Sequence, residues 1–133
     1  MTVMTDTDKL VIEEFVAFRE RLIDGLRNKH PYVLSIADNI LAGKQNKMSM
    51  QIVDGGQIAG QYTFHLDGVR ITNADSGKLE SEIHHPFLGI VKPYVIVERN
   101  TLKNIISDEA AFSADLFAAI AKYLPEITVK FMR

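Results

Sequence analysis

The segment KMSMQIVDGGQIAGQYTFHLDGVRI, residues 47–71, alternates apolar and polar residues with a period of two. Met48 and Met50 fall on one side of an extended strand, and Tyr62 and Phe64 fall on one side of a second strand. The alternation predicts strands with one apolar and one polar face. We expect the rest of the chain to cover the apolar face.

Two glycine-containing turns divide this segment. Gly55 and Gly56 tolerate positive φ and can close a turn after the first strand. Asp67-Gly68 is typical of a two-residue type I′ hairpin turn, which needs positive φ at both central positions. The segment therefore predicts an antiparallel meander of three strands.

Composition limits the class of protein. The chain has 133 residues, 47% of them hydrophobic, which predicts a single domain over residues 1–133 with a disordered tail at residues 1–7. A net charge of −2 with scattered basic residues argues against nucleic acid as a partner. No stretch reaches the roughly 20 apolar residues of an integral membrane segment. The N-terminus is acidic and polar, unlike a signal peptide, and cysteine is absent, so we expect a cytoplasmic protein.

Helical periodicity flanks the meander. An apolar stripe that includes Val11, Phe15, Phe18, Leu22 and Leu26 predicts a long first helix, begun by Asp6, Thr7 or Asp8. A second short helix is predicted over residues 32–41. One further helix should carry Phe112, Leu116, Ile120 and Tyr123 on one side and end at Pro125.

Three later segments read as strands. Residues 79–83 alternate like a half-buried strand, residues 94–97 are unbroken and β-branched, and residues 127–131 alternate again. The order of elements predicts an α+β fold, with a mostly antiparallel sheet of about five strands and helices packed on one face. Tyr62, Phe64, Phe112, Phe117 and Phe131 should meet between the sheet and the C-terminal helix.

Candidates for catalysis are few. Adjacent residues of a strand point to opposite faces, so His84 and His85 do not suit one metal ion, and we expect no metal site and no cofactor. His65 and His84 with Glu80 or Glu82 are the candidates for a small-molecule enzyme, provided that they converge in one concave site. Otherwise His84 is a polar-face residue and His85 helps to form the turn before Pro86.

The apolar residues of the chain favour a binding function over an enzymatic one. Methionine is flexible and polarizable, which suits a surface that repacks around different apolar ligands, although the same residues also suit an ordinary core. The leading hypothesis is non-enzymatic binding or carriage of a hydrophobic small molecule in a cavity between the sheet and the C-terminal helices. The predicted lining comprises Met48, Met50, Tyr62, Phe64, Phe112, Leu116 and Phe117.

An interaction module is the alternative. The segment of residues 86–91 is an apolar loop, which is either a lid or partner surface, or part of the core. Together with an outer strand at residues 127–131 it could join a partner protein or a second copy of the chain in a homo-oligomer.

The element order and the segment YVIVERNTLKNIISDEAAFSADLFAAI, residues 94–120, resemble the sterol carrier protein superfamily. Val95, Val97, Leu102, Ile105 and Ile106 occupy the hydrophobic places of that family's strand-then-helix passage, and the strand pair ending at Asp67-Gly68 is similar. The resemblance covers residues 46–131. It implies an apolar tunnel between the sheet and the C-terminal helices for a fatty acyl chain, sterol or other lipid, and it carries over no catalytic residue.

The chain also departs from the family pattern. Asp108 or Glu109 stands where the family usually has glycine, and residues 125–131 replace its closing glycine-rich strand. The chain has no tryptophan, so the family's tryptophan-rich strand has no counterpart. These departures affect the ligand class more than the fold.

Overall fold

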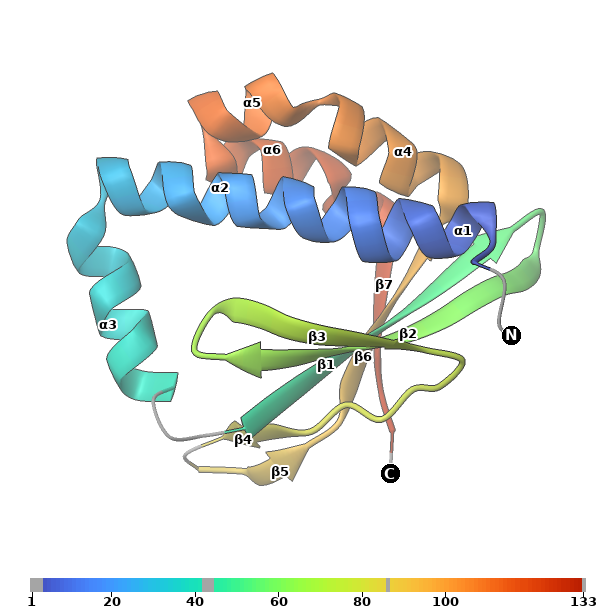
Figure 1. The fold of residues 1–133 in the computed structure, drawn as a ribbon, viewed down its shortest axis with the longest axis horizontal. Coiled ribbons are helices and arrows are strands. Elements are labelled where there is room, and N and C mark those ends of the chain that lie inside the picture. The colour runs from blue at the N-terminus through green and yellow to red at the C-terminus, as the bar shows by residue number, and fades with distance from the viewer. Residues whose placement is uncertain (1–3, 42–44, 86, 133) are drawn as a thin grey trace.

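Helices cover one face of a five-stranded sheet in the computed structural model, which describes residues 4–41, 45–85 and 87–132 (Figure 1). The sheet is mostly antiparallel and contains one parallel pair. The helices α1, α2, α4, α5 and α6 lie above this sheet in the view, and α3 descends beside it from the end of α2. The predicted α+β fold is confirmed.

The meander forms one side of the sheet, in the strand order β3-β2-β1-β6-β7. The predicted antiparallel pairs β1·β2 and β2·β3 are present, whereas β6 runs parallel to β1 and antiparallel to β7. The five strands are β1 (Gln45–Asp54), β2 (Gln57–Asp67), β3 (Arg70–Ser76), β6 (Pro93–Glu98) and β7 (Ile127–Phe131).

Both predicted hairpins form, but the turn types differ from expectation at the second. Gly55 and Gly56 both have positive φ, at 60° and 81°, as a type I′ turn requires. Between β2 and β3 the two turn residues are Gly68 and Val69, and only Gly68 has positive φ. The prediction of a type I′ turn at Asp67-Gly68 is wrong, because positive φ at the first central residue alone is the pattern of type II′.

A continuous helix runs from Asp6 to Lys29 along the sheet. Thr5 caps it by accepting a 3.0 Å hydrogen bond from the Asp8 amide, while the Asp8 carboxylate accepts one from the Thr5 amide, so the helix begins inside the predicted tail. Its parts are α1 (Asp6–Asp8), a π-helical segment (Lys9–Phe15) and α2 (Val16–Lys29), and the predicted second helix follows as α3 (Pro31–Leu41).

The C-terminal helical region is broken where the periodicity predicts one helix. Asp115 leaves the helical conformation, with φ −151° and ψ 94°, and accepts a 3.1 Å hydrogen bond from the Ala118 amide. It therefore caps a new helix instead of continuing the old one. The elements here are α4 (Arg99–Ser107), α5 (Glu109–Ala114), α6 (Leu116–Tyr123) and a 3₁₀ turn (Leu124–Glu126).

Aromatic rings connect the sheet to the helical layer. Phe15 lies 5.9 Å from Phe64 and 6.4 Å from Phe18, measured between ring centroids. Phe18 meets Phe112 edge-on at 5.4 Å, and Phe112 stacks on Tyr123 at 5.8 Å. These contacts link the two buried clusters, one centred on Ile52 and Tyr62 at the sheet and the other under α5 and α6.

Two aromatic residues predicted for this core lie outside it. Phe117 is 78% exposed and Phe131 is 66% exposed. The break at Asp115 gives Phe117 a place on a separate short helix, and Phe131 lies at the end of the edge strand β7. The prediction that they meet Tyr62 and Phe64 in the core is wrong.

A chain segment crosses the polar face of the sheet, and this corrects a second prediction. The Glu80 amide donates to the hydroxyls of Ser49 and Thr63, at 3.1 and 2.9 Å, and Glu82 pairs with Lys47 in an isolated bridge. Residues 79–83 therefore add no strand to the sheet. Ser49 and Thr63 are fully buried although the alternation places them on a wet face.

A small hairpin follows the crossing segment. It consists of β4 (Ile83–His85) and β5 (Gly89–Val91), which pair with each other in a separate two-stranded sheet. Part of the predicted apolar loop of residues 86–91 is therefore strand, and Pro86 lies outside the described residues.

Candidate functional site

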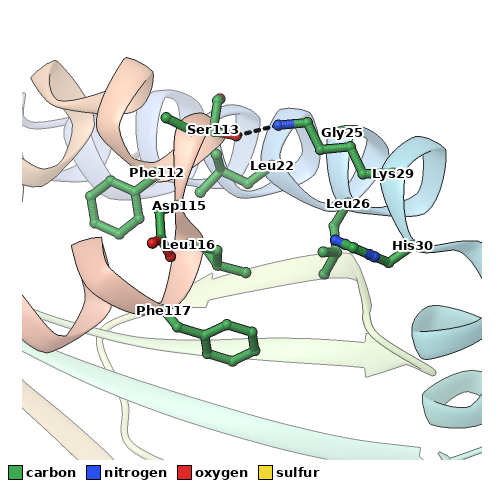
Figure 2. Close-up of a pocket in the computed structure, with 11 residues that line it drawn as sticks. Leu22, Gly25, Leu26, Lys29, His30, Phe112, Ser113, Asp115, Leu116 and Phe117 are labelled. Atoms are coloured by element: carbon green, nitrogen blue, oxygen red, sulfur yellow. Dashed lines mark hydrogen bonds between the residues drawn. The ribbon is translucent and has the colours of Figure 1, made fainter.

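An apolar pocket lies between the C-terminal half of α2 and the corner formed by α5 and α6 (Figure 2). The stripe that buries Phe18 continues along α2 to Leu22 and Leu26, and the break at Asp115 places Leu116 opposite them. The pocket has a volume of about 200 Å³. Its lining comprises Leu22, Gly25, Leu26, Lys29, His30, Phe112, Ser113, Ala114, Asp115, Leu116 and Phe117.

Gly25 leaves open space in the wall of this pocket. A Cβ atom built on Gly25 would meet no atom within 4 Å other than those of its chain neighbours and the adjacent backbone of its own helix. Glycine in a helix interior costs about 1 kcal/mol relative to alanine, so the sequence gives up helix stability at this position. A larger side chain in place of Gly25 can therefore fill part of the pocket without a clash.

Polar contacts fasten α2 to α5 around the pocket. The Lys29 ammonium donates to the Ser113 carbonyl at 2.6 Å, as Figure 2 shows, and Arg21 forms a bidentate pair with Glu109 at 2.7 to 3.1 Å. The hydrogen bond from Arg21 lowers the pKa of Glu109. These contacts hold the two helices at the separation that the pocket requires.

A second apolar pocket, also of about 200 Å³, lies between the first half of α2 and the sheet. It is built where apolar residues of β1, β2, β3 and β6 share the face that the helix covers. Its lining comprises Phe15, Arg19, Met48, Ser49, Met50, Phe64, Leu66, Ile71 and Val95.

Arg19 is the charged member of this second lining. Its guanidinium donates to the Val69 carbonyl at 2.6 Å, which ties α2 to the turn between β2 and β3. Burial lowers the pKa of Arg19, because desolvation disfavours the charged form.

The seven residues predicted to line one cavity fall into three places. Met48, Met50 and Phe64 line the pocket at the sheet, and Phe112, Leu116 and Phe117 line the pocket at α5 and α6. Tyr62 lines neither; it is fully buried, and its hydroxyl donates to the Asp8 carboxylate at 2.7 Å.

The prediction omitted α2, which contributes to both pockets. Leu22, Gly25 and Leu26 line the pocket at α5 and α6, and Arg19, together with Phe15 just before α2, lines the pocket at the sheet. The sequence held a usable signal, because the apolar stripe extends to Leu26 and the only glycine of the helix interrupts it at Gly25.

The histidines proposed for acid–base chemistry occupy separate settings. His65 Nε2 lies 2.6 Å from the Asp75 carboxylate, and this hydrogen bond lowers the pKa of Asp75. The pocket beside His65 is otherwise lined by residues of β1, β2 and β3 and does not include His84. His85 ends β4 and accepts from the amides of Phe87 and Leu88 through Nδ1, at 3.1 and 3.0 Å, so it supports the turn that follows it and not one before Pro86.

The described part of the chain contains no cluster of three or more histidine, cysteine, aspartate or glutamate residues placed to hold a metal ion. Within the same residues no helix is both long and apolar enough to cross a membrane. Comparison with known proteins finds no family profile that matches the chain and no curated protein of significantly similar sequence.

Proposed function

We propose that the protein binds and carries a hydrophobic small molecule, such as a fatty acyl chain or another lipid, without chemical conversion. The observation that carries the proposal is the pair of apolar pockets along α2, one against the sheet and one against α5 and α6. Both lie in the helical side of the molecule, where the resemblance to sterol carrier proteins implies an apolar tunnel.

Exposed apolar residues beside the pocket at α5 and α6 support the proposal. Phe117 lines this pocket yet is 78% exposed, and Ile120 on the same helix is 39% exposed. Each square ångström of apolar surface removed from water contributes about 25 cal/mol, so an acyl chain that covers Phe117 gains affinity from it.

A binding assay with defined lipids tests the proposal. Decanoic acid and cholesterol serve as two probes of different shape, and a bound probe should raise the melting temperature further as its free concentration rises above the dissociation constant. Native mass spectrometry and lipid extraction of the purified protein should show the bound molecule directly. No co-purifying lipid and no shift with either probe would contradict the proposal.

Substitutions of Gly25 connect binding to the pocket. Gly25→Leu should fill the open space and weaken probe binding at least tenfold. Gly25→Ala is the matched control, since it supplies the same gain in helix propensity with a much smaller side chain. Because both variants should be at least as stable as the natural protein, weaker binding by Gly25→Leu cannot be attributed to unfolding.

A second candidate function is an interaction module, favoured by the tip of the β4–β5 hairpin. Phe87 is 92% exposed and Leu88 is 71% exposed. Exposed contiguous apolar residues usually mark a contact surface. Light scattering of the natural protein and of Phe87→Ser tests whether this tip joins copies of the chain. The same oligomeric state for both proteins would count against an interaction through the tip.

A further inference from the structure

The strand β7 is one free edge of the sheet. Among the described residues it pairs with β6 on one side only, and it is the last strand in the sheet order. The opposite edge, β3, carries Arg70, Asn73 and Asp75, and such polar and charged residues discourage edge-to-edge pairing. The sequence of β7 is ITVKF, with Lys130 as its single charge.

The register with β6 shows which backbone groups of β7 point outward. Pro93 pairs with Phe131, and the Met132 amide donates to the Lys92 carbonyl at 2.8 Å. Lys92 and Met132 are the next pair along the ladder, and they are joined by this hydrogen bond. Because hydrogen-bonded and non-hydrogen-bonded pairs alternate in an antiparallel ladder, Pro93 and Phe131 form a non-hydrogen-bonded pair. Phe131, and by the same alternation Val129 and Ile127, therefore direct their backbone groups to the free edge.

Two β7 strands from two copies of the chain can pair antiparallel about a two-fold axis at Val129. In this arrangement the outward backbone N–H and C=O groups of one β7 face those of the other. Val129 then faces Val129 of the second copy as a hydrogen-bonded pair, and the Phe131 amide faces the Ile127 carbonyl of the second copy. The Ile127 amide keeps its present acceptor, the Leu124 carbonyl. An isologous contact of this kind is the commonest arrangement in homodimers.

The side chains match in the same register. Ile127 packs against both buried clusters, so the face that it shares with Val129 and Phe131 is the face that the helices cover. On that face Ile127 meets Phe131 and Val129 meets Val129. On the other face Thr128 meets Lys130, a polar pair free of like-charge contact.

The pairing also explains two exposed apolar residues. Val129 is 53% exposed and Phe131 is 66% exposed on a sheet face that is otherwise covered. The helical layer lies over the Ile127 end of β7, and the register places Phe131 beside that end of the second copy. From these observations we infer that the protein forms a symmetric dimer through β7, with one ten-stranded sheet.

Analytical ultracentrifugation over a concentration series tests the dimer. The natural protein should pass from monomer to dimer, whereas Val129→Lys should remain monomeric at concentrations at least tenfold higher, because it places like charges opposite each other. Phe87→Ser should dimerise like the natural protein. Association that survives Val129→Lys, or a natural protein that stays monomeric throughout the series, would overturn the inference.

Cysteine variants test the register against a chain that has no cysteine of its own. In the proposed pairing the Cα atoms of the two Val129 residues lie about 5.5 Å apart, within the range of a disulfide, whereas those of the two Thr128 residues lie about 8 Å apart and outside it. Diamide, which removes two hydrogen atoms from two thiols, should therefore cross-link Val129→Cys at least tenfold faster than Thr128→Cys. Equal rates, or faster cross-linking of Thr128→Cys, would exclude this register.

Discussion

Tyr62 joins the first helix to the sheet through both its buried ring and its hydroxyl. Its side chain is fully buried, and its hydroxyl donates to the Asp8 carboxylate at 2.7 Å. This hydrogen bond is the main reason that the pKa of Asp8 is lowered, and burial with the same bond raises the pKa of Tyr62. The hydroxyl thus links β2 to the first turn of the chain's first helix.

Replacing Tyr62 by phenylalanine should lower the free energy of unfolding by roughly 1 to 2 kcal/mol at neutral pH, because a hydrogen bond to a charged carboxylate is lost. The folded-state pKa of Asp8 lies below its unfolded value, so this stabilisation is present above about pH 4 and is lost as the pH falls through the folded pKa. Urea unfolding of both proteins at neutral and acidic pH should show the difference narrowing below about pH 4. A difference that stays constant, or a double-mutant cycle with Asp8→Asn that gives no coupling, would argue against the bond.

Gly60 and Gly25 should respond to alanine with opposite sign. A Cβ on Gly60 would lie 2.5 to 2.8 Å from the ring and hydroxyl of Tyr62, which has no room to move, whereas a Cβ on Gly25 meets nothing within 4 Å. We expect Gly60→Ala to destabilise by about 1 to 3 kcal/mol and Gly25→Ala to stabilise by about 0.5 to 1 kcal/mol. Thermal unfolding measures both, and shifts of the same sign would contradict the contacts described.

At the scale of elements, the break between α5 and α6 determines the pocket. Asp115 caps α6, and Asp108 at the start of α5 accepts hydrogen bonds from Lys122 and Tyr123, each at 3.0 Å. The bond from Lys122 is the main reason that the pKa of Asp108 is lowered. The two aspartates together hold α6 folded back against α5, and Leu116 and Phe117 reach the pocket only in that arrangement.

Asp115→Ala should destabilise the protein by about 0.5 to 2 kcal/mol, because the Ala118 amide loses its capping acceptor. Asp115→Asn is the matched control, since asparagine caps as well as aspartate. Lipid binding should fall with Asp115→Ala and persist with Asp115→Asn, measured by the thermal shift with decanoic acid. If the two variants unfold at the same temperature, the cap has no energetic role.

At the scale of the whole molecule, stability should be unequal between the main sheet and the small hairpin. β1 lies in the middle of the sheet and contains the fully buried Ser49 and Ile52, whereas β4 and β5 are three residues each and end in an exposed tip. Hydrogen exchange followed by mass spectrometry should find the amides of β1 and β6 protected roughly 100-fold or more beyond those of β4 and β5. Equal protection would mean that another surface covers the hairpin.

The sequence predicted the local structure well, and the long-range arrangement less so. Alternation and glycine turns located β1, β2 and β3, because side-chain period and positive φ are local properties. The same alternation at residues 79–83 indicated an extended chain but not its neighbours, and that segment crosses the sheet. Asp115 was missed because capping competes with helix continuation, and the apolar periodicity from Phe112 to Tyr123 reads through it.

The sequence predicted which kinds of residue line the candidate site better than it predicted where the pockets lie in the fold. The apolar face with Met48, Met50 and Phe64 followed from period two, and each of these residues lines a pocket. The contribution of α2 to the pocket lining was not predicted from the sequence, because which face of a helix meets which part of a sheet depends on packing between distant segments.

The parallel pairing of β1 with β6 affects how the protein folds while it is being synthesised. β1 ends at Asp54, and its neighbour β6 begins only at Pro93, after the meander and the β4–β5 hairpin have been completed. During synthesis the first helix and the meander therefore emerge with the inner edge of β1 unpaired. Non-local closure of this kind slows folding and leaves strand edges open to association, so a nascent chain that stalls before Pro93 should be the form most prone to aggregate.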